Sequence, residues 1–459
     1  MRLLRPLTGH VSCLRTLPRW KIVAALGAGV GLALSFPIHP VRPLAWVALA
    51  PLLATLEGEG ARARFWLGWL CGAGLFVVGL HWLVGTMHHF GYLPLPLSIL
   101  GQLLLAGFLA CFPGAFALGA PALGLGRAWG VLGLPALWVT TEGLRSWLFT
   151  GFPWFTLGYS QMGYLSLVQV LDVTGIHGLS ALLVAASVVT ERVWAAARGR
   201  GAWPLVSGVG VASVVAAALA YGSWRLAETP APAPTLEVAL LQGNIPQDQK
   251  WDEAFKASTV DTYLELADRV AGHGPDLVVL PETALPFWFQ NGGPNAERAL
   301  GLATRTGARV IVGAPAFVEH DAEPGAERSY EYRNRAYLLD PEGRVADRYD
   351  KLHLVPFGEY SPVPFLSAFV EGVGNFRPGE QRVLFDIPGF GRIGTLICYE
   401  AIFPEEARAA VRGGARLLVN ITNDAWFGEL GAPVQHLEMA VARAVENRVW
   451  VVRAANTGI

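Results

Sequence analysis

The chain has 459 residues, of which 53% are hydrophobic and only 15% are charged, and its formal net charge at pH 7 is −1. Soluble proteins carry about 25% charged residues on average. The composition therefore excludes an intrinsically disordered chain and argues against a wholly soluble one. No run of basic residues indicates nucleic-acid binding.

The overall charge conceals two different halves. Residues 1–226 contain 14 Lys or Arg and 5 Asp or Glu, whereas residues 227–459 contain 21 and 31. The first half is as poor in charge as a membrane protein, and the second has the composition of a soluble domain. We predict a transmembrane bundle over 1–226 and a separate domain over 227–459.

Seven apolar segments of the first half are candidates for membrane spans, because a spanning helix needs about 20 mostly apolar residues. The first is short and rich in Gly and Ala, and the fourth contains Pro113; membrane helices tolerate both features. The segments cover residues 21–37, 41–57, 65–87, 94–124, 128–147, 173–195 and 203–225.

Lys and Arg indicate the orientation of the bundle, because they are enriched in cytoplasmic connections. Eleven of them lie before the first segment and in the connections after the second, fourth and sixth segments, whereas Arg42, Arg145 and Arg225 lie on the other side. We therefore expect a cytoplasmic N-terminus. Seven spans then place residues 227–459 outside the cytoplasm.

A polar cluster interrupts the apolar half. Glu142 and Arg145 end the fifth segment, and Gln161, Asp172 and His177 follow. Charges near the ends of membrane helices are costly unless they are paired or hydrated. The cluster therefore either marks a functional site or contains a Glu142–Arg145 pair that holds the bundle together.

The second half alternates apolar, β-branched runs with helical patterns, which predicts a layered α/β domain. We expect strands at 236–242, 276–280, 309–315, 335–339, 344–349, 394–398, 417–421 and 450–453. Helices are expected at 253–271, 296–306, 404–411 and 435–447.

Two charged residues stand next to apolar runs of this domain. Glu282 follows the run Asp276–Leu280. Partial desolvation there raises the pKa of the carboxyl group toward neutrality, which suits a general base; the alternative is a capping or ion-paired Glu. Lys351 lies among apolar residues, and taken alone it is more often a solvated Lys than one held for its charge.

Cys398 ends another apolar run, shortly before the helix expected at Pro404. A thiol near a helix N-terminus and a cation has a lowered pKa and becomes a nucleophile; the alternative is a small buried hydrophobe. Cys398 is the only cysteine of the second half, so a disulfide within that half is excluded. No motif indicates a metal or a cofactor.

Several motifs occur together in a recognisable order. The Glu282, Lys351 and Cys398 motifs have the order and spacing of the Glu–Lys–Cys triad of the nitrilase superfamily. Together with the preceding spans, further motifs make the whole chain resemble the bacterial apolipoprotein N-acyltransferases. The motifs are Leu280–Ala284, Tyr349–Glu359, Ile397–Glu400, Gln242–Pro246 with Trp251, Phe152–Trp154, Asn423–Gly428 and Asn456–Ile459.

This resemblance implies a nitrilase αββα sandwich on a membrane bundle in the bacterial inner membrane, with the sandwich on the periplasmic side. It implies transfer of an acyl chain from a phospholipid, typically phosphatidylethanolamine, to the α-amino group of the S-diacylglyceryl cysteine of an apolipoprotein. No cofactor or metal is implied. The family pattern continues beyond the Asn456–Ile459 motif with more of the sandwich and a last span, which this sequence does not include.

By motif, Cys398 is the nucleophile, Glu282 the general base and Lys351 the stabiliser of the oxyanion. Supporting or substrate-binding positions are Trp251, Asn334, Glu359, Tyr399 and Glu400.

Two other classes of function stay open. A membrane-tethered amidase that uses water as acceptor shares the triad but needs a closed, polar pocket. A transporter or scaffold that only binds does not need Cys398. The apolar residues 364–370 between two triad motifs are expected to form a lid at the membrane interface, or else to pack in the core.

Overall fold

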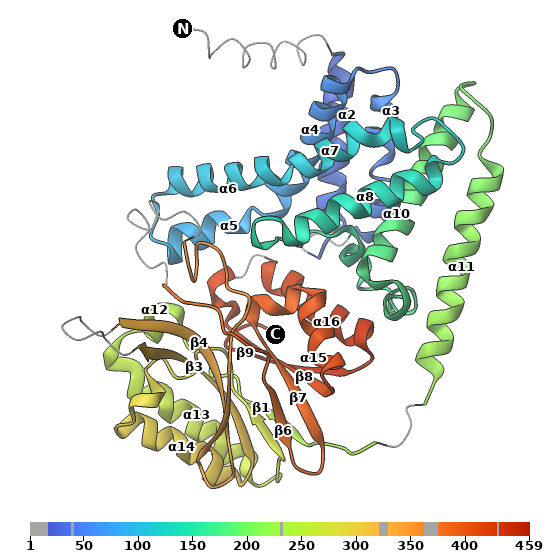
Figure 1. The fold of residues 1–459 in the computed structure, drawn as a ribbon. Helices are drawn as coiled ribbons and strands as arrows, with labels where there is room; N and C mark the ends of the chain where they lie inside the picture. The colour runs from blue at the N-terminus through green and yellow to red at the C-terminus, as the bar shows by residue number, and fades with distance from the viewer. Residues whose placement is uncertain (1–16, 38–40, 230–232, 321–328, 362–374, 429–430) are drawn as a thin grey trace. The chain divides into compact units, whose positions relative to one another are not determined.

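The computed structural model describes residues 17–37, 41–229, 233–320, 329–361, 375–428 and 431–459. The expected lid, residues 364–370, lies outside them. The chain divides into two compact units (Figure 1). Met1–Gly85 and Pro94–Thr229 form the helical unit, and Thr86–Leu93 with Pro230–Ile459 form the α/β unit.

Each expected apolar segment of the helical unit coincides with one or more helices. Glycines allow some of them to pack closely: a Cβ at Gly29 would lie 1.9 Å from the Cys71 carbonyl oxygen, and one at Gly68 would lie 2.3 Å from that of Pro113. The elements are α2 (Arg19–Leu34), η1 (Arg42–Trp46), α3 (Ala50–Leu56), α4 (Ala61–Gly79), α5 (Trp82–Gly85), α6 (Leu95–Leu109), α7 (Cys111–Gly119), η3 (Ala120–Leu123), α8 (Gly130–Trp147), η4 (Leu148–Thr150), η5 (Leu157–Gln161), α9 (Leu165–Val168), α10 (Leu171–Ala197) and α11 (Leu205–Ala227).

Three helical stretches within the described residues are long and apolar enough to cross a membrane: Leu95–Leu123, Leu171–Ala197 and Leu205–Ala227. A fourth is added if Ala61–Gly79 and Trp82–Phe90, which are bent by 54° relative to each other, form one span. The helices at the other expected segments are shorter or less apolar, so the number of seven crossings stays a prediction.

Glu142 and Arg145 on α8 hold an irregular loop inside the helical unit. Glu142 Oε1 accepts the backbone N–H of Leu157 at 2.8 Å, and Arg145 Nη1 donates to the carbonyl oxygen of Phe152 at 2.7 Å and to that of Trp154. Irregular backbone at membrane depth is tolerated only where the protein satisfies its polar groups. Among the described residues, the two charges therefore stabilise the bundle through this loop, without a hydrogen bond to each other.

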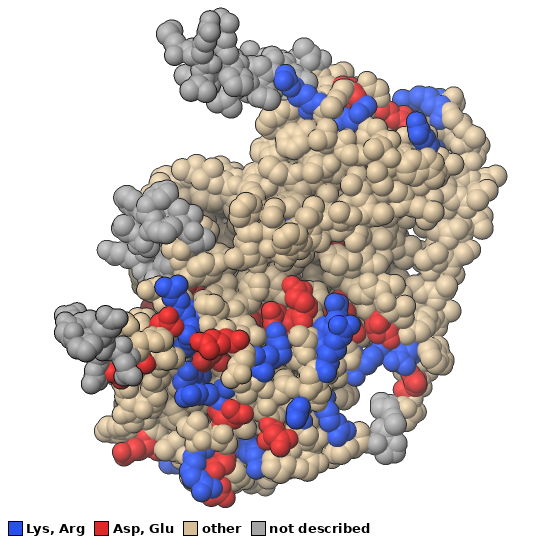
Figure 2. All heavy atoms as spheres, viewed as in Figure 1, with Lys and Arg blue, Asp and Glu red and all other residues tan. Residues whose placement is uncertain are grey.

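Basic side chains gather at one end of the helical unit, which is otherwise almost free of charge in the view of Figure 2. Lys21, at the start of α2, donates to the Thr55 carbonyl oxygen at 2.9 Å and to Glu59 Oε1 at 2.6 Å. Arg64 Nε donates to the Leu56 carbonyl oxygen at 3.3 Å. The start of α2 and the connection between α3 and α4 thus lie together, as the expected topology requires.

The α/β unit contains two sheets, in the orders β1-β2-β3-β4-β5 and β6-β7-β8-β9. In the first, β1, β2 and β3 are parallel and β4 and β5 continue antiparallel; in the second, β6 is antiparallel to β7 and the rest are parallel. The strands are β1 (Val238–Leu240), β2 (Leu277–Val279), β3 (Arg309–His320), β4 (Ser329–Leu339), β5 (Val345–Asp350), β6 (Leu384–Ile387), β7 (Gly391–Ile397), β8 (Ala415–Thr422) and β9 (Trp450–Ala455).

The two sheets pack face to face through an apolar core that includes Leu277, Ile311, Ile397 and Val419. Helices cover the outer face of each sheet (Figure 1). The result is the expected αββα sandwich; β6 was not expected. The helices are α12 (Gln247–Lys250), α13 (Lys256–Ala271), α14 (Pro294–Thr306), α15 (Pro404–Arg412) and α16 (Ala432–Asn447), and the short turns are η2 (Thr86–Phe90), η6 (Glu253–Phe255), η7 (Phe289–Asn291), η9 (Cys398–Ile402) and η10 (Asp424–Phe427).

Hydrogen bonds between residues that are distant in sequence join the loop after β1 to the end of β9. Asn244 N donates to the Asn456 carbonyl oxygen at 2.9 Å. The Asn456 side chain accepts from Ile245 N at 3.1 Å and donates to the Ile245 carbonyl oxygen at 2.9 Å, across 211 sequence positions. This junction fixes the segment that precedes α12 against the second sheet.

Candidate active site

The three residues of the expected triad lie directly beyond strands of the two facing sheets. Glu282 follows β2, Lys351 follows β5 and Cys398 follows β7. They are 6%, 1% and 7% exposed. The interpretation of Lys351 as a solvated residue is therefore wrong, because its amine is buried against the carboxylates of Glu282 and Glu359.

Glu282 has defined partners at both carboxylate oxygens. Its Oε1 accepts from Asn334 Nδ2 at 2.8 Å and lies 3.4 Å from Lys351 Nζ. Its Oε2 accepts the backbone N–H of Asn423 at 3.0 Å. These contacts come from β4 and from the residues directly after β5 and β8, so the carboxylate is held at a fixed place where the strand ends meet.

Lys351 lies between two carboxylates. Its Nζ is 2.9 Å from Glu359 Oε2 and 3.4 Å from Glu282 Oε1, and Asn334 Nδ2 also donates to Glu359 Oε1 at 2.7 Å. Burial alone would lower the pKa of Lys351, but Glu359 and then Glu282 outweigh burial and raise it above its usual value. The amine is therefore a charged donor at neutral pH.

Cys398 has a left-handed backbone conformation, with φ = 50°. Burial and then the charges of Glu282 and Asp424 raise the pKa of its thiol, although Lys351 and a contact with Thr422 act in the opposite direction. The lowered pKa expected from the sequence is therefore wrong. Cys398 begins only the short turn η9, and the regular helix α15 begins at Pro404. Because the thiol is buried and its pKa is raised, it needs a base to become a nucleophile.

Glu400 joins the segment of Lys351 to the strand of Cys398. Its Oε1 accepts from Tyr349 Oη at 2.8 Å and from Leu352 N at 2.6 Å, and its Oε2 accepts from Ile397 N at 2.7 Å. Burial raises the pKa of Glu400 to about 7, even though these donors stabilise the carboxylate. The residue thus links the two sheets at the site.

The remaining two expected residues differ in their surroundings. Tyr399 is buried, with its ring 5.1 Å from that of Phe403 and 5.9 Å from that of His353. Trp251, at the end of α12, is 45% exposed. It therefore lies at the surface of the α/β unit, outside the buried group of Glu282, Lys351, Glu359 and Glu400.

Lys250 was not expected at the site. It is 1% exposed, and its Nζ donates to the Glu282 carbonyl oxygen at 3.2 Å. Burial lowers its pKa to about 7, while Glu282 and Cys398 act in the opposite direction. The only sequence signal was its position beside Trp251, and one lysine in a polar helical turn gives no indication of burial.

Asp424 and His436 were also not expected. The Cys398 sulfur, a carboxylate oxygen of Asp424 and a ring nitrogen of His436 lie within 4.8 Å of one another, the one such group of possible metal ligands in the described part of the chain. Both ring nitrogens already have partners, at 2.9 Å in Asp424 and 3.1 Å in the Cys398 carbonyl group. We therefore interpret the group as a hydrogen-bonded array.

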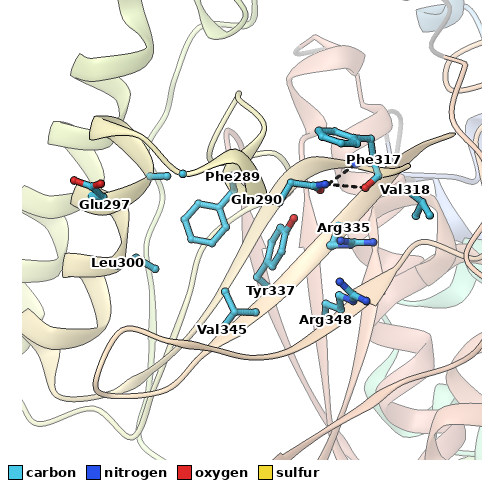
Figure 3. A pocket seen from close by; sticks show the side chains of 12 residues that line it. Phe289, Gln290, Glu297, Leu300, Phe317, Val318, Arg335, Tyr337, Val345 and Arg348 are labelled. Carbon is cyan, nitrogen blue, oxygen red and sulfur yellow. Dashed lines mark hydrogen bonds between the residues drawn. The ribbon is translucent and has the colours of Figure 1, made fainter. Parts of the chain in front are cut away.

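A separate cleft of about 470 Å³ lies between α14 and the strands β3 to β5 (Figure 3). Tyr337 and Arg335 line it, and the Gln290 side chain bridges to the backbone of Phe317. Neighbouring residues of a strand point to opposite faces, so Asn334 faces the site while Arg335 faces the cleft. None of the expected site residues lines this cleft.

Comparisons with known proteins cover both units. Residues 28–189 match the family model described as the apolipoprotein N-acyltransferase N-terminal domain, and residues 237–459 match that of the carbon–nitrogen hydrolases. A solved amidase of the nitrilase superfamily from Nesterenkonia AN1 is 24% identical, covers 49% of this chain and 78% of its own, and gives a TM-score of 0.32.

Two curated relatives extend over nearly the whole chain. The apolipoprotein N-acyltransferase of Geobacter metallireducens is 45% identical over 453 residues, which cover 96% of this chain and 85% of the relative. That of Allorhizobium ampelinum is 36% identical over 475 residues, with the same coverage. Because one relative matches the helical and the α/β unit together at this level of identity, the chain belongs to the apolipoprotein N-acyltransferase family.

Proposed function

We propose that this integral membrane acyltransferase takes an acyl chain from a phospholipid, such as phosphatidylethanolamine, and carries it as a thioester on Cys398. It then delivers the chain to the α-amino group of the S-diacylglyceryl cysteine of an apolipoprotein. The proposal rests on one observation: Glu282, Lys351 and Cys398 are buried beyond three strand ends of facing sheets.

In the first half-reaction, the Glu282 carboxylate accepts the proton of the Cys398 thiol, and the thiolate attacks the ester carbonyl carbon of the phospholipid. The Lys351 ammonium stabilises the tetrahedral oxyanion; one such donor typically contributes about 2.7–4 kcal/mol. The ester C–O bond then breaks. The departing alkoxide takes the proton from Glu282 and leaves as lysophospholipid, and the acyl chain stays on sulfur.

In the second half-reaction, the neutral α-amine of the apolipoprotein attacks the thioester carbonyl carbon. The C–S bond breaks, an amide forms, and the amine proton passes through Glu282 to the sulfur. Asn334 and Glu359 support both steps by orienting Glu282 and Lys351. Tyr399, Glu400 and the exposed Trp251 complete the set of supporting or substrate-binding residues that we propose.

We further propose that residues 1–226 form a bundle that crosses the inner membrane seven times and that residues 227–459 form the catalytic domain on the periplasmic side. The eleven-to-three distribution of Lys and Arg supports this orientation. The gathering of Lys21 and Arg64 at one end of the helical unit is consistent with it.

Mass spectrometry of the intact enzyme after incubation with phosphatidylethanolamine, without acceptor, tests the proposal. The wild type should gain one acyl chain that hydroxylamine removes, and the chain should map to Cys398. Cys398→Ala should gain none, and Cys398→Ser should be nearly as poor because a hydroxyl group is far less acidic than a thiol. Cys71→Ala and Cys111→Ala are the matched controls.

Three results would contradict the proposal. A Cys398→Ala enzyme that still forms the acyl-enzyme with normal turnover would exclude Cys398 as the nucleophile. A Glu282→Gln enzyme that acylates normally would exclude Glu282 as the general base. Release of free fatty acid without a lipid-derived acyl-enzyme would favour the amidase alternative, in which water is the acceptor.

A further inference from the structure

Lys250, the last residue of α12, is a buried lysine that the chemistry proposed above does not use. It is 1% exposed. The other buried lysine of the site, Lys351, has two carboxylates within 3.4 Å. The amine of Lys250 instead contacts a backbone carbonyl oxygen, that of Glu282 at 3.2 Å, and forms no ion pair among the described residues. Burying an amine without such a pair costs free energy, so its position needs a physical explanation.

The carbonyl group of Glu282 depends on this contact. Glu282 is 6% exposed, and a buried backbone carbonyl group needs a donor from the protein. Within the part of the chain that the structure describes, Lys250 Nζ is the one donor to it. The bond spans 32 sequence positions. It therefore ties the residue that follows β2 to α12.

The Glu282 carbonyl group leads into a strained turn. The next residue, Thr283, has a left-handed backbone conformation with φ = 47°, which is costly for a β-branched residue. The turn also packs closely on β3, because a Cβ at Gly313 would lie 2.6 Å from Thr283 N and 2.7 Å from the Pro281 carbonyl oxygen. A strained conformation persists only where its surroundings enforce it. Strand β3 and the amine of Lys250 both contribute to that enforcement.

Lys250 also reaches the second loop that holds Glu282. The side-chain amide of Asn423 lies 3.3 Å from Lys250 Nζ and 3.2 Å from Trp426 Nε1, and two donors at one end of an amide assign that end to the oxygen. The backbone N–H of Asn423 donates to Glu282 Oε2 at 3.0 Å. One amine thus contacts both the main chain of Glu282 and the residue that binds its carboxylate.

The segment that carries Lys250 is itself fixed. The hydrogen bonds between Ile245 and Asn456 join the loop before α12 to the end of β9. Gln247, at the start of α12, contacts the Asn423 side chain at 2.8 Å. Burial lowers the pKa of Lys250 to about 7, and an amine keeps N–H donors in both protonation states. The contact with the carbonyl group therefore does not require the charge.

We propose that Lys250 is a positioning residue for the general base: through the Glu282 carbonyl group and the Asn423 side chain, it fixes the turn that presents the Glu282 carboxylate to the site. The inference rests on the proposed role of Glu282. Other contacts hold the carboxylate by its oxygens, whereas Lys250 holds the backbone that carries it. Without the amine, a buried carbonyl group loses its donor and the turn shifts, which slows proton transfer from Cys398. A displacement of about 1 Å at a reacting group costs up to about a hundredfold in rate.

A double-mutant cycle tests whether Lys250 acts through Glu282. It compares the full-length wild type, Lys250→Met, Glu282→Gln and the double variant. The first readout is the rate of Cys398 alkylation by iodoacetamide, followed by mass spectrometry of its peptide, because this reaction removes the thiol proton but needs no lipid. The second is kcat and KM with phosphatidylethanolamine. Lys256→Met, which removes a partner of Glu253 at the surface of the same unit, is the matched control.

In Lys250→Met, the alkylation rate and kcat should fall about tenfold or more, while KM stays within about twofold. In the Glu282→Gln background, the same substitution should change the alkylation rate by less than about twofold, because no base is left to position. Lys256→Met should match the wild type. An equal loss in both backgrounds would overturn the inference, since Lys250 would then act on Cys398 or on the fold. An unchanged rate in Lys250→Met would overturn it as well.

If Lys250→Met does not fold, Lys250→Gln takes its place in the cycle. Glutamine keeps a polar group in the buried site, but its donor is one bond shorter and does not reach the Glu282 carbonyl oxygen. The single variants separate the two levels of the proposal. If Glu282→Gln alkylates and acylates like the wild type, the proposed base is wrong and the inference falls with it. If Glu282→Gln is impaired and the Lys250 variant is not, only the role of Lys250 is wrong.

Discussion

Glu400 Oε1 accepts the backbone N–H of Leu352 at 2.6 Å, and this bond ties the residue after Lys351 to a side chain two positions beyond Cys398. The proposed oxyanion donor and the proposed nucleophile belong to different sheets. Their separation therefore depends on how the sheets are joined at this edge. The single carboxylate of Glu400 connects them, because it accepts hydrogen bonds from Leu352 N and from Ile397 N.

Replacing Glu400 by Gln should therefore affect both stability and activity. The amide group has one acceptor oxygen instead of two, so one backbone N–H, of Leu352 or of Ile397, would face an N–H₂ group. We expect a loss of about 1–3 kcal/mol of unfolding free energy and a fall in acylation of at least tenfold. Thermal unfolding and thioester formation measure the two effects. Glu405→Gln, at an exposed position five residues further on, should leave both unchanged.

Lys351→Met should be more damaging than the loss of one hydrogen bond. The substitution leaves Glu282 and Glu359 buried together without their shared cation. Breaking a buried ion pair from one side costs about 3–5 kcal/mol, and the oxyanion loses its donor. We expect a lower unfolding temperature and no acyl-enzyme. Arg344→Met, which removes an exposed charge, is the control; equal acylation in both variants would exclude Lys351 from the mechanism.

Lys250 should make stability depend on pH above neutrality. Burial lowers its pKa to about 7 from an ordinary value of 10.5. Between these values the folded chain binds one proton fewer than the unfolded chain at this site, so the unfolding free energy rises with pH, by up to about 1.4 kcal/mol per pH unit. Lys250→Met should lack this contribution. Denaturant unfolding in detergent at pH 7, 8, 9 and 10 measures the slope, with Lys256→Met, at a surface ion pair, as control. Identical slopes in Lys250→Met and the wild type would show that the amine is not desolvated.

Labelling with a membrane-impermeant maleimide tests the proposed orientation. In a background without the four native cysteines, single cysteines replace Glu265 on α13 and Ala202 between α10 and α11, both exposed positions. Glu265→Cys should react in intact cells from the periplasmic side, and Ala202→Cys should react only after the inner membrane is opened. The reverse pattern would contradict the proposed topology.

Alternating apolar runs and helical patterns predicted a layered α/β domain, and the family resemblance specified the αββα sandwich, which is confirmed. The roles of Glu282, Lys351 and Cys398 stay predictions. Strand β6 was missed: Leu384–Ile387 is only four residues long and lies at the edge of its sheet. The burial of Lys351 was not evident either, since its partner Glu282 comes from another segment and its distances to Glu282 and Glu359 depend on the fold.

The pKa of Cys398 was predicted in the wrong direction for a related reason. The sequence indicated the helix that begins at Pro404, but it did not show that the thiol is buried or that the charge of Glu282 acts on it. Lys250 and His436 are held at the site by contacts with the backbone carbonyl groups of Glu282 and Cys398. Every residue has a backbone carbonyl group, so no residue type in the sequence could indicate these contacts.

The junction between Asn244, Ile245 and Asn456 also determines when the enzyme becomes competent during its synthesis. The bonds connect residues 211 positions apart, and contacts of such long range form late and slowly in folding. A ribosome has to add β9 before the loop after β1 finds its partner. The nascent α/β unit therefore holds its proposed nucleophile before this part of the site is formed.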